Sequence, residues 1–272
     1  MDNRPIGVFD SGLGGLTVLR EMMKHCPNEK LVYFGDCGRI PYGTKSKETV
    51  QKYTLQDINF LLSKNVKAIV IACNTASAYG YELAKQSIDH PVFEVVSPGA
   101  RAAVRETKTG RIGVIGTAGT ISTGVYEKAI RSEAGEWQVE IFSKACPMFV
   151  PLVEEGWWSN EIALKIIEEY LLPLKALEID TLVLGCTHYP ILEPLISKVM
   201  GTSVRLVSSG VEIAGQIAEF CAVNDIHSDS KFESPDNCEY FTSDSTERFS
   251  EFGEAFLGQK IPVTEYVAIE KY

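Results

Sequence analysis

Short apolar runs alternate with segments of helical periodicity along the first hundred residues. The runs that read as buried strands are IGVFD (6–10), LVYFGD (31–36), KAIVIAC (67–73) and VFEVVSP (92–98). The segments with apolar residues at helical spacing are 17–26, 46–65 and 77–87, and the second begins with SKET, which suits an N-cap. Apolar strands that alternate with helices predict a parallel sheet covered on both faces.

The same pattern then starts again. RIGVIGTAGTISTGVYEKAI (111–130) parallels PIGVFDSGLGGLTVLREM (5–22), and TLVLGC (181–186) parallels KAIVIAC. Two similar units of similar span indicate an internal duplication. We therefore expect an α/β protein of two pseudo-symmetric domains, each a mostly parallel sheet flanked by helices. Their expected limits are residues 1–98 with 208–272 for the first domain, and 99–207 for the second.

The remaining segments complete these two domains. Residues 137–147 resemble a strand, and 159–179 predict a helix with a break or restart at Pro173. After Ser208 we expect a helix (211–224), a polar loop (226–237), a strand (238–243), a shorter helix and a final extended segment.

Composition narrows the possible functions of the 272 residues. The 26 basic and 36 acidic side chains give a formal charge of −10, which argues against general nucleic-acid binding. No apolar run approaches the ~18 residues that span a bilayer, and the start lacks a secretory signal, so we expect no membrane association. Seven cysteines, an odd number without a CxxC pair, favour neither a disulfide scaffold nor a structural zinc site, and a reducing cytoplasm fits best.

Two of the cysteines stand where chemistry is expected. Cys73 and Cys186 each end a predicted strand of one unit. Ligands of open parallel sheets bind beyond the carboxyl ends of the strands. If the two units face one another, the two thiols can approach one ligand from opposite sides, as inversion of a stereocentre requires. A thiol is about 3% ionised at pH 7, and a following helix N-terminus, expected after each cysteine, raises that fraction.

Six motifs in order carry a resemblance over residues 5 to 220 that continues weakly beyond. They are DSGLGGLTVL, GDCGRIPYG, ACNTASA, GTAGT, VPLVEEG and GCTHYP. Together they resemble the glutamate racemases of the cofactor-independent aspartate/glutamate racemase family. The resemblance implies an active site in the cleft between two α/β domains, and interconversion of L- and D-glutamate for peptidoglycan. It also implies a cytoplasmic homodimer without cofactor or metal. Aspartate is the alternative substrate.

The resemblance also implies roles for individual residues. Cys73 would handle the α-proton on the D-glutamate side with help from Asp10, and Cys186 the one on the L side with help from His188. The residues that would hold the substrate are Asp10, Ser11, Pro41, Tyr42, Gly43, Asn74, Thr75, Thr117, Thr120, Thr187 and His188. Whether the family's acidic residue is Glu154 or Glu155 stays open.

Asp10 and Asp36 also allow simpler interpretations from their positions alone. Asp10 precedes glycines and could form a turn or cap a helix, while Asp36 is equally a supporting acid or a strand-end cap. A glycine-rich turn followed by Asp36 suits a dinucleotide-binding oxidoreductase, but Thr17 replaces the last glycine of that fingerprint.

Three further functions use the same residues. A thiol hydrolase needs one cysteine with His188 as base, so the other cysteine would be idle. A zinc site could draw on Cys73, Cys186, His188 and Asp10, although their spacing is not diagnostic. A two-lobed amino-acid binding protein needs no paired thiols.

Overall fold

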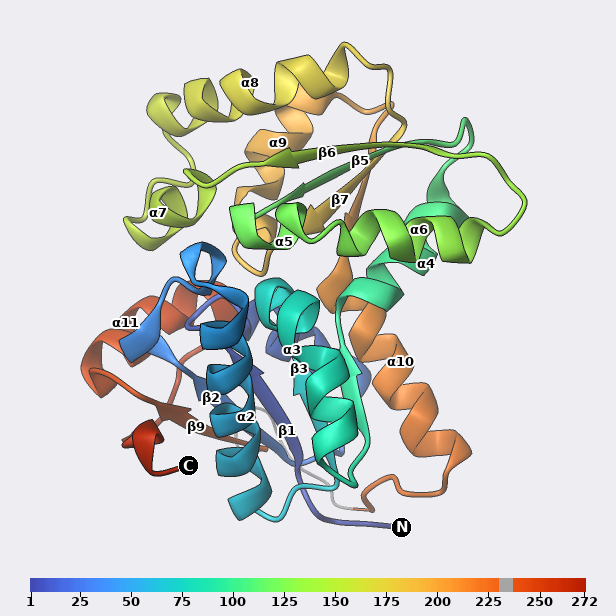
Figure 1. Cartoon of the computed structure of the whole chain (residues 1–272). Helices are drawn as coiled ribbons and strands as arrows, with labels where there is room; N and C mark the ends of the chain where they lie inside the picture. The colour runs from blue at the N-terminus through green and yellow to red at the C-terminus, as the bar shows by residue number, and fades with distance from the viewer. Residues whose placement is uncertain (230–236) are drawn as a thin grey trace. The chain divides into compact units, whose positions relative to one another are not determined.

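The computed structural model describes residues 1–229 and 237–272. The chain divides into two compact units, called here the first domain (Met1–Val95 with Gly210–Tyr272) and the second domain (Val96–Ser209). Both consist of a parallel sheet flanked by helices (Figure 1). The predicted α/β fold class is confirmed.

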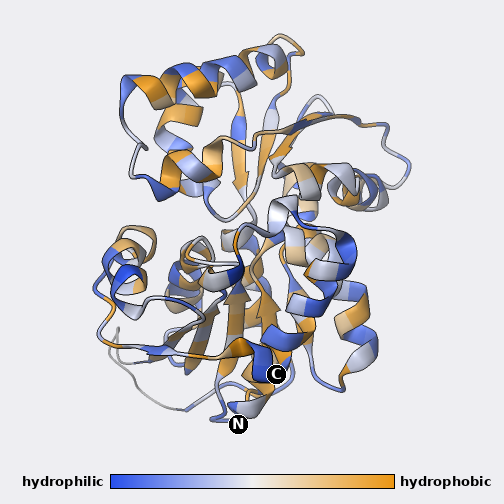
Figure 2. Cartoon of the chain, turned by 60° about the vertical axis from the view of Figure 1, so that its left-hand side comes forward, coloured by the Kyte–Doolittle hydropathy of each residue, from blue (hydrophilic) through white to orange (hydrophobic). Residues whose placement is uncertain are grey.

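The first domain contains a six-stranded sheet among its described residues, in the order β10-β9-β2-β1-β3-β4, and all its pairings are parallel. The strands are β1 (Ile6–Asp10), β2 (Leu31–Gly35), β3 (Ala68–Ile71), β4 (Val92–Glu94), β9 (Cys238–Thr242) and β10 (Thr264–Tyr266). β1, β2 and β3 are buried along their whole length, and Figure 2 shows the strands of this sheet largely in the hydrophobic colour. This burial explains why the strands are continuous apolar runs.

Helices cover both faces of this sheet. They are α1 (Leu16–His25), α2 (Lys47–Ser63), α3 (Asn74–Ser87), α10 (Ser209–Val223) and α11 (Thr246–Leu257), with short 3₁₀ turns η1 (Cys37–Arg39), η2 (Tyr42–Thr44) and η4 (Ile269–Lys271). Phe9 and Phe34 face the core under α2 and α3. Tyr33 faces the other side and contacts Phe249 of α11, which packs on α1. Ser46 accepts a hydrogen bond from Thr49 N, so the predicted N-cap of α2 is confirmed.

The second domain repeats this topology with a four-stranded parallel sheet, β6-β5-β7-β8. Its strands are β5 (Arg111–Gly116), β6 (Glu140–Ala145), β7 (Thr181–Gly185) and β8 (Arg205–Ser208). Its helices are α4 (Val96–Glu106), α5 (Ala118–Ser122), α6 (Val125–Ala134), α7 (Phe149–Glu154), α8 (Glu161–Lys175) and α9 (Glu193–Met200), with the 3₁₀ turn η3 (Tyr189–Leu192). In Figure 1, α8 and α9 lie on one side of this sheet and α4 and α6 on the other. The order β6-β5-β7-β8 corresponds to β2-β1-β3-β4, as a duplication predicts.

Two predicted elements were wrong in extent. β4 ends at Glu94, and α4 begins at Val96, because Val96, Ala100 and Ala103 enter the second core at helical spacing. α8 does not break at Pro173 but continues to Lys175. Pro173 stands in the last turn, where a missing N–H removes only one hydrogen bond, and Ala176 N still bonds to Leu172 O.

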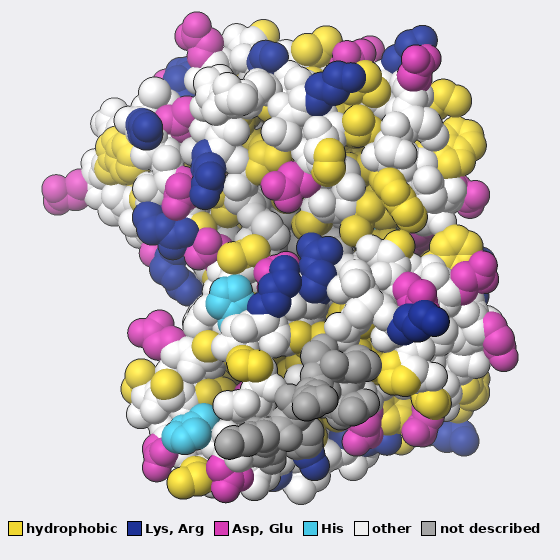
Figure 3. Space-filling view, turned by 180° about the vertical axis from the view of Figure 1, so that it is seen from behind, with side chains coloured by type: hydrophobic (Ala, Val, Ile, Leu, Met, Phe, Trp, Pro, Cys, Tyr) yellow, Lys and Arg dark blue, Asp and Glu magenta, His cyan; other side chains and the backbone are white. Residues whose placement is uncertain are grey.

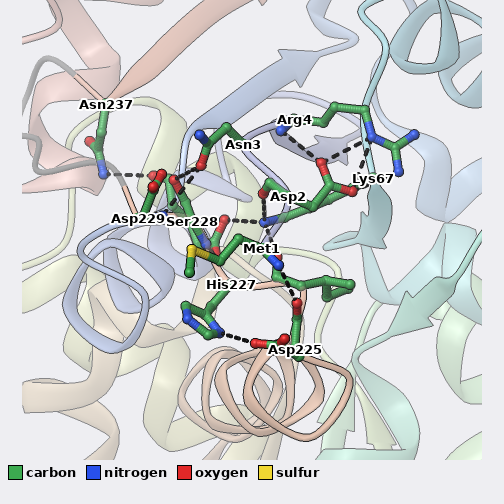
Figure 4. A network of polar contacts seen from close by, with 12 residues as sticks. Met1, Asp2, Asn3, Arg4, Lys67, Asp225, His227, Ser228, Asp229 and Asn237 are labelled. Atoms are coloured by element: carbon green, nitrogen blue, oxygen red, sulfur yellow. Dashed lines mark hydrogen bonds and ion pairs between the residues drawn. The ribbon is translucent and has the colours of Figure 1, made fainter.

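A network of polar contacts around the buried Lys67 lies at the amino edge of the first sheet (Figure 4). Lys67 precedes β3, and its Nζ donates to the carbonyl oxygens of Asp2 and Ile226, 2.7 Å from each. The same Nζ lies 2.5 Å from Glu29 Oε2. The amino group of Met1 donates to Asp225 O at 2.7 Å. These contacts connect the N-terminal residues to the segment that follows α10. Most of the predicted loop 226–237 lies outside the described residues, at 230–236.

Outer surfaces carry mixed charge. On the face shown in Figure 3, acidic side chains lie among the basic ones. Glu106, for example, pairs with both Arg105 and Arg205. Such exposed pairs stabilise a fold by at most ~1 kcal/mol each. Across the described part of the chain, no helix is long and apolar enough to cross a bilayer.

Candidate functional site

Each sheet has a topological switch point at its carboxyl edge. The chain leaves β1 for β2 on one side and later reaches β3 on the other, and β5, β6 and β7 repeat this arrangement. Such a point opens a crevice where α/β proteins bind ligands. Cys73 follows β3, and Cys186 follows β7. The structure thus brings each predicted cysteine to the switch point of its own domain.

We call the predicted residues at the first switch point the Cys73 cluster: Asp10, Ser11, Cys73, Asn74 and Thr75. Cys73 is the N-cap of α3, and its sulfur accepts a hydrogen bond from Ala76 N at 3.5 Å. Ser11 Oγ lies 3.6 Å from the same sulfur. The thiol is 5% exposed and faces the positive end of a fourteen-residue helix. A helix N-terminus favours the thiolate, so this position suits a cysteine that gives and takes a proton.

Asp10 is the last residue of β1 and is fully buried. Its Oδ2 accepts a hydrogen bond from Gly12 N at 3.0 Å, so the turn-forming role considered for it is present. α1 approaches this side chain so closely that a Cβ at Gly15 would lie 2.4 Å from the Asp10 Cβ. The glycine-rich turn therefore packs α1 against the aspartate, and the catalytic role of Asp10 stays a prediction.

The loop from η1 to η2 holds the predicted residues Pro41, Tyr42 and Gly43. The Tyr42 hydroxyl is buried between two carboxyl groups: it contacts Asp36 Oδ2 and lies 2.9 Å from Asp57 Oδ2. Tyr42 is 1% exposed. Its phenol is therefore directed into the domain, and the ligand contact predicted for this loop stays a prediction.

We call the predicted residues at the second switch point the Cys186 cluster: Thr117, Thr120, Cys186, Thr187 and His188. Cys186 is followed by a turn closed by Tyr189 N and Cys186 O, then by η3, and α9 begins only at Glu193. The expectation that a helix N-terminus faces both thiols therefore holds for Cys73 only. In its place, His188 Nδ1 lies 3.9 Å from Cys186 Sγ.

His188 joins Cys186 to an acidic residue. Its side chain is 7% exposed, and its Nε2 lies 3.3 Å from Glu154 Oε1 at the end of α7. Burial lowers the pKa of His188, but hydrogen bonds with Cys186 and Glu154 outweigh burial and raise it to about 10. The ring is therefore an imidazolium at neutral pH, with its charge beside the thiol. The acidic residue that the sequence left open is Glu154 in this structure, not Glu155.

Thr117 and Thr120 make a local cap at the start of α5. Thr117 Oγ1 accepts a hydrogen bond from Thr120 N at 3.2 Å, and the two hydroxyl oxygens lie 3.0 Å apart. They follow β5, beside β7 and Cys186. Their position suits the predicted contact with a ligand, while their hydrogen bonds show a structural role.

The five other cysteines do not share these surroundings. All seven cysteines are free. Burial raises the pKa of Cys26, Cys37 and Cys146 to about 12 and that of Cys221 to about 11, and it also raises the pKa of Cys238. These groups remain thiols at neutral pH. Within the described ranges, no three His, Cys, Asp or Glu side chains converge as metal ligands.

Arg39 and Asp57 surround Asp36 and Tyr42 but were not predicted. Asp57 is fully buried in α2, on the stripe that also carries Val50 and Leu61. An acidic residue on the apolar stripe of a helix is a signal that could have identified it. No local signal marks Arg39, whose partners come from other segments.

Comparisons with known proteins identify the family of the chain. The family model described as Asp/Glu/Hydantoin racemase matches residues 6–217. The glutamate racemase of Streptococcus gordonii is 48% identical over 97% of this chain and 98% of its own. The structure of glutamate racemase isoform RacE1 from Bacillus anthracis has a TM-score of 0.93 at 38% identity and covers 98% of both chains. Glutamate racemase from Francisella tularensis, solved with D-glutamate, has a TM-score of 0.91 at 36% identity and covers both chains completely. The chain therefore belongs to the Asp/Glu/hydantoin racemase family.

Proposed function

We propose that this protein interconverts L- and D-glutamate by a two-base mechanism in which Cys73 and Cys186 act on opposite faces of Cα. The observation that carries the proposal is the placement of one thiol at the switch point of each domain, each beside a positive charge or helix N-terminus. Relatives that are nearly half identical over almost the whole chain are glutamate racemases, which favours glutamate over aspartate.

In the direction from L to D, Cys186 acts as the base. Its thiolate, paired with the His188 imidazolium, takes the α-proton of L-glutamate, and the electron pair of the broken C–H bond moves into the carboxylate. The Cys73 thiol then protonates the opposite face, so Cys186 ends as a thiol and Cys73 as a thiolate. The reverse reaction begins from that state. General acid–base catalysis contributes roughly 10²–10⁴-fold in rate for each group.

The weakly acidic α-proton requires stabilisation of the carboxylate charge that develops. We assign this task to main-chain N–H groups and hydroxyls at the two switch points and in the η2 loop: those of Ser11, Gly43, Asn74, Thr75 and Thr187. Preorganised donors of this kind contribute several kcal/mol in enzymes, because they need no reorganisation during the reaction. Asp10 supports Cys73 in this scheme as His188 supports Cys186.

We also propose a cellular setting. The resemblance implies that D-glutamate enters peptidoglycan and that the enzyme is a homodimer. Seven free cysteines suit the reducing cytoplasm. Sedimentation analysis tests the dimer, and rescue of a bacterium auxotrophic for D-glutamate tests the cellular role.

Circular dichroism of the four substrates tests the activity directly. L-glutamate, D-glutamate, L-aspartate and D-aspartate are each incubated with the protein without added cofactor, in D₂O. We expect loss of optical activity from both glutamate enantiomers, with deuterium at Cα, and little change in aspartate. Faster turnover of aspartate would assign the alternative substrate. Racemisation with the original hydrogen retained would contradict the two-base mechanism.

A further inference from the structure

A buried polar cluster lies beneath the loop that carries Tyr42 and Gly43. We call it the Asp36–Asp57 cluster; it consists of Asp36, Arg39, Tyr42, Asp57 and Ser243. Asp36 follows β2, Arg39 and Tyr42 come from η1 and η2, Asp57 from α2, and Ser243 follows β9. Both aspartates are fully buried, and the Arg39 side chain is 11% exposed. Segments from three separate parts of the chain thus meet at one loop.

Arg39 bridges the two acids. Its Nε donates to Asp36 Oδ2 at 2.6 Å, and its Nη2 donates to Asp57 Oδ1 at 2.8 Å. The third donor reaches Gln56 Oε1 at 2.6 Å, and the guanidinium lies 4.0 Å above the Tyr53 ring. Two carboxylates and one guanidinium would leave a net negative charge in the interior, which is costly. One proton on either acid removes that charge.

The Tyr42 hydroxyl indicates where the proton lies. It contacts Asp36 Oδ2 and Asp57 Oδ2 but has a single proton to donate. Asp36 already accepts from Ser243 Oγ at 2.7 Å and from Arg39, so it suits the ionised state. Asp57 has fewer donors facing it. If Asp57 Oδ2 carries the proton, it donates a hydrogen bond to Tyr42 Oη, and Tyr42 donates its own proton to Asp36 Oδ2. This arrangement satisfies every one of these contacts.

The charges around Asp57 agree with this assignment. Burial, followed by the charge of Asp36, raises the pKa of Asp57 well above its ordinary value. The opposing groups are Arg39 and the Tyr42 hydroxyl, and Asp10 adds a further negative charge. Burial and the charge of Asp36 also hold the pKa of Tyr42 well above its ordinary value, so the phenol keeps its proton.

We propose that Asp57 is a neutral carboxylic acid that positions the substrate loop by holding the Tyr42 side chain, while the main chain of Tyr42 and Gly43 faces the ligand. The role of the loop rests on the proposed function; the protonation of Asp57 does not. η2 packs against α3, whose first residues are Asn74 and Thr75. The cluster thereby fixes the loop beside the Cys73 cluster, and Asp57 acts as a positioning residue without touching the substrate.

Infrared difference spectroscopy tests the protonation. The spectrum of the wild-type protein minus that of Asp57→Asn, at neutral pH, should contain the C=O stretching band of a neutral carboxylic acid. Asp36→Asn removes a negative charge that disfavours the ionised form of Asp57, so the band should weaken in this variant as well. A band that is lost in Asp36→Asn and kept in Asp57→Asn, or no such band in any difference spectrum, would overturn the assignment. This readout does not depend on catalysis.

Kinetics test the positioning role. An asparagine at position 57 can donate to Tyr42 and accept from Arg39, so Asp57→Asn should keep KM for glutamate within about twofold. Asp57→Ala should raise KM about tenfold or more while kcat changes less, because a displaced loop loses its binding geometry. An equal rise of KM in Asp57→Asn and Asp57→Ala would contradict the proposal. If glutamate is not turned over at all, the proposed function fails while the infrared result still stands.

Glu29→Gln is the matched control for a buried acid. Glu29 is 4% exposed and pairs with Lys67 at the amino edge of the same sheet. This substitution should lower the melting temperature and leave KM unchanged. An equal rise of KM in Glu29→Gln and Asp57→Ala would show that general destabilisation, rather than loop position, causes the effect, and it would overturn the proposal.

Discussion

The Cys73 and Cys186 clusters occupy equivalent places in two domains of the same topology, yet different groups stand beside the two thiols. Cys73 caps a fourteen-residue helix and contacts Ser11. Cys186 precedes only a turn and instead faces His188, which Glu154 holds from its other side. The strand and the cysteine are repeated in both domains, whereas the activating group is not.

The electrostatic field at Cys73 is therefore independent of pH, whereas the field at Cys186 depends on the protonation of His188. The amide dipoles of α3 act on Cys73 at any pH, while the charge beside Cys186 exists only when His188 is protonated. The equilibrium constant of racemisation is one, so kcat/KM must be equal in the two directions for every variant. The asymmetry can therefore be measured in exchange of the α-proton, which reports one face at a time.

Loss of either thiol should have the largest effect. Cys73→Ser and Cys186→Ser should each lower racemisation by roughly 10²–10⁴-fold, because serine is a far weaker acid. In D₂O, Cys73→Ser should still exchange the α-proton of L-glutamate and Cys186→Ser that of D-glutamate, as followed by proton NMR. Cys146→Ser is the control and should racemise normally. If turnover is retained after loss of either thiol, the result would favour a thiol hydrolase, which needs only one cysteine.

His188→Asn should affect one face more than the other. Loss of the imidazolium removes the positive charge beside Cys186, so α-proton exchange from L-glutamate should slow about 10²-fold, and from D-glutamate less. Alkylation by iodoacetamide, resolved by peptide mapping, should slow at Cys186 and not at Cys73. Equal slowing at both cysteines would show that the two clusters do not differ as described.

The pH dependence should reveal the same asymmetry. The folded-state pKa of His188 is raised from 6.5 to about 10, so its protonated ring stabilises the fold fully below pH 6.5. This contribution decreases as pH rises through about 10. Urea denaturation should therefore show a stability gap between wild type and His188→Asn that closes toward pH 10. A gap that widens with pH would contradict the assignment.

Glu154→Gln should have the smallest effect. The Glu154 side chain is 29% exposed, so its pairing with His188 is screened and contributes at most ~1 kcal/mol, or about a fivefold change in exchange from L-glutamate. Its neighbour Glu155 is exposed, and Glu155→Gln is the matched control without effect. An equal change of the exchange rate in both variants would show that Glu154 does not support His188.

Local sequence patterns were sufficient for most of the fold. The apolar runs before Cys73 and Cys186 are buried strands, and Ser46 caps α2 as predicted. The errors arose where local preference and tertiary packing disagree. Val96 has a strand-forming side chain but lies in the first turn of α4, and Pro173 is tolerated near the end of α8.

The candidate site could be predicted only in part. Both cysteines and His188 follow strand ends, a position that any parallel sheet turns toward its ligand. Glu154 could not be chosen over Glu155, because the choice depends on a contact with His188, 34 positions away. Asp57 and Arg39 were missed because their partners gather from several segments only in the folded chain.

The sequence by itself determined the α/β class, the repeated strand-and-cysteine pattern and the family, since periodicity and motif order are properties of neighbouring residues. Only the tertiary structure decided which group stands beside each thiol and where the Tyr42 hydroxyl points. The physical reason is that electrostatic and hydrogen-bonding partners are selected by distance in space, and burial, which sets their strength, exists only after the chain has packed.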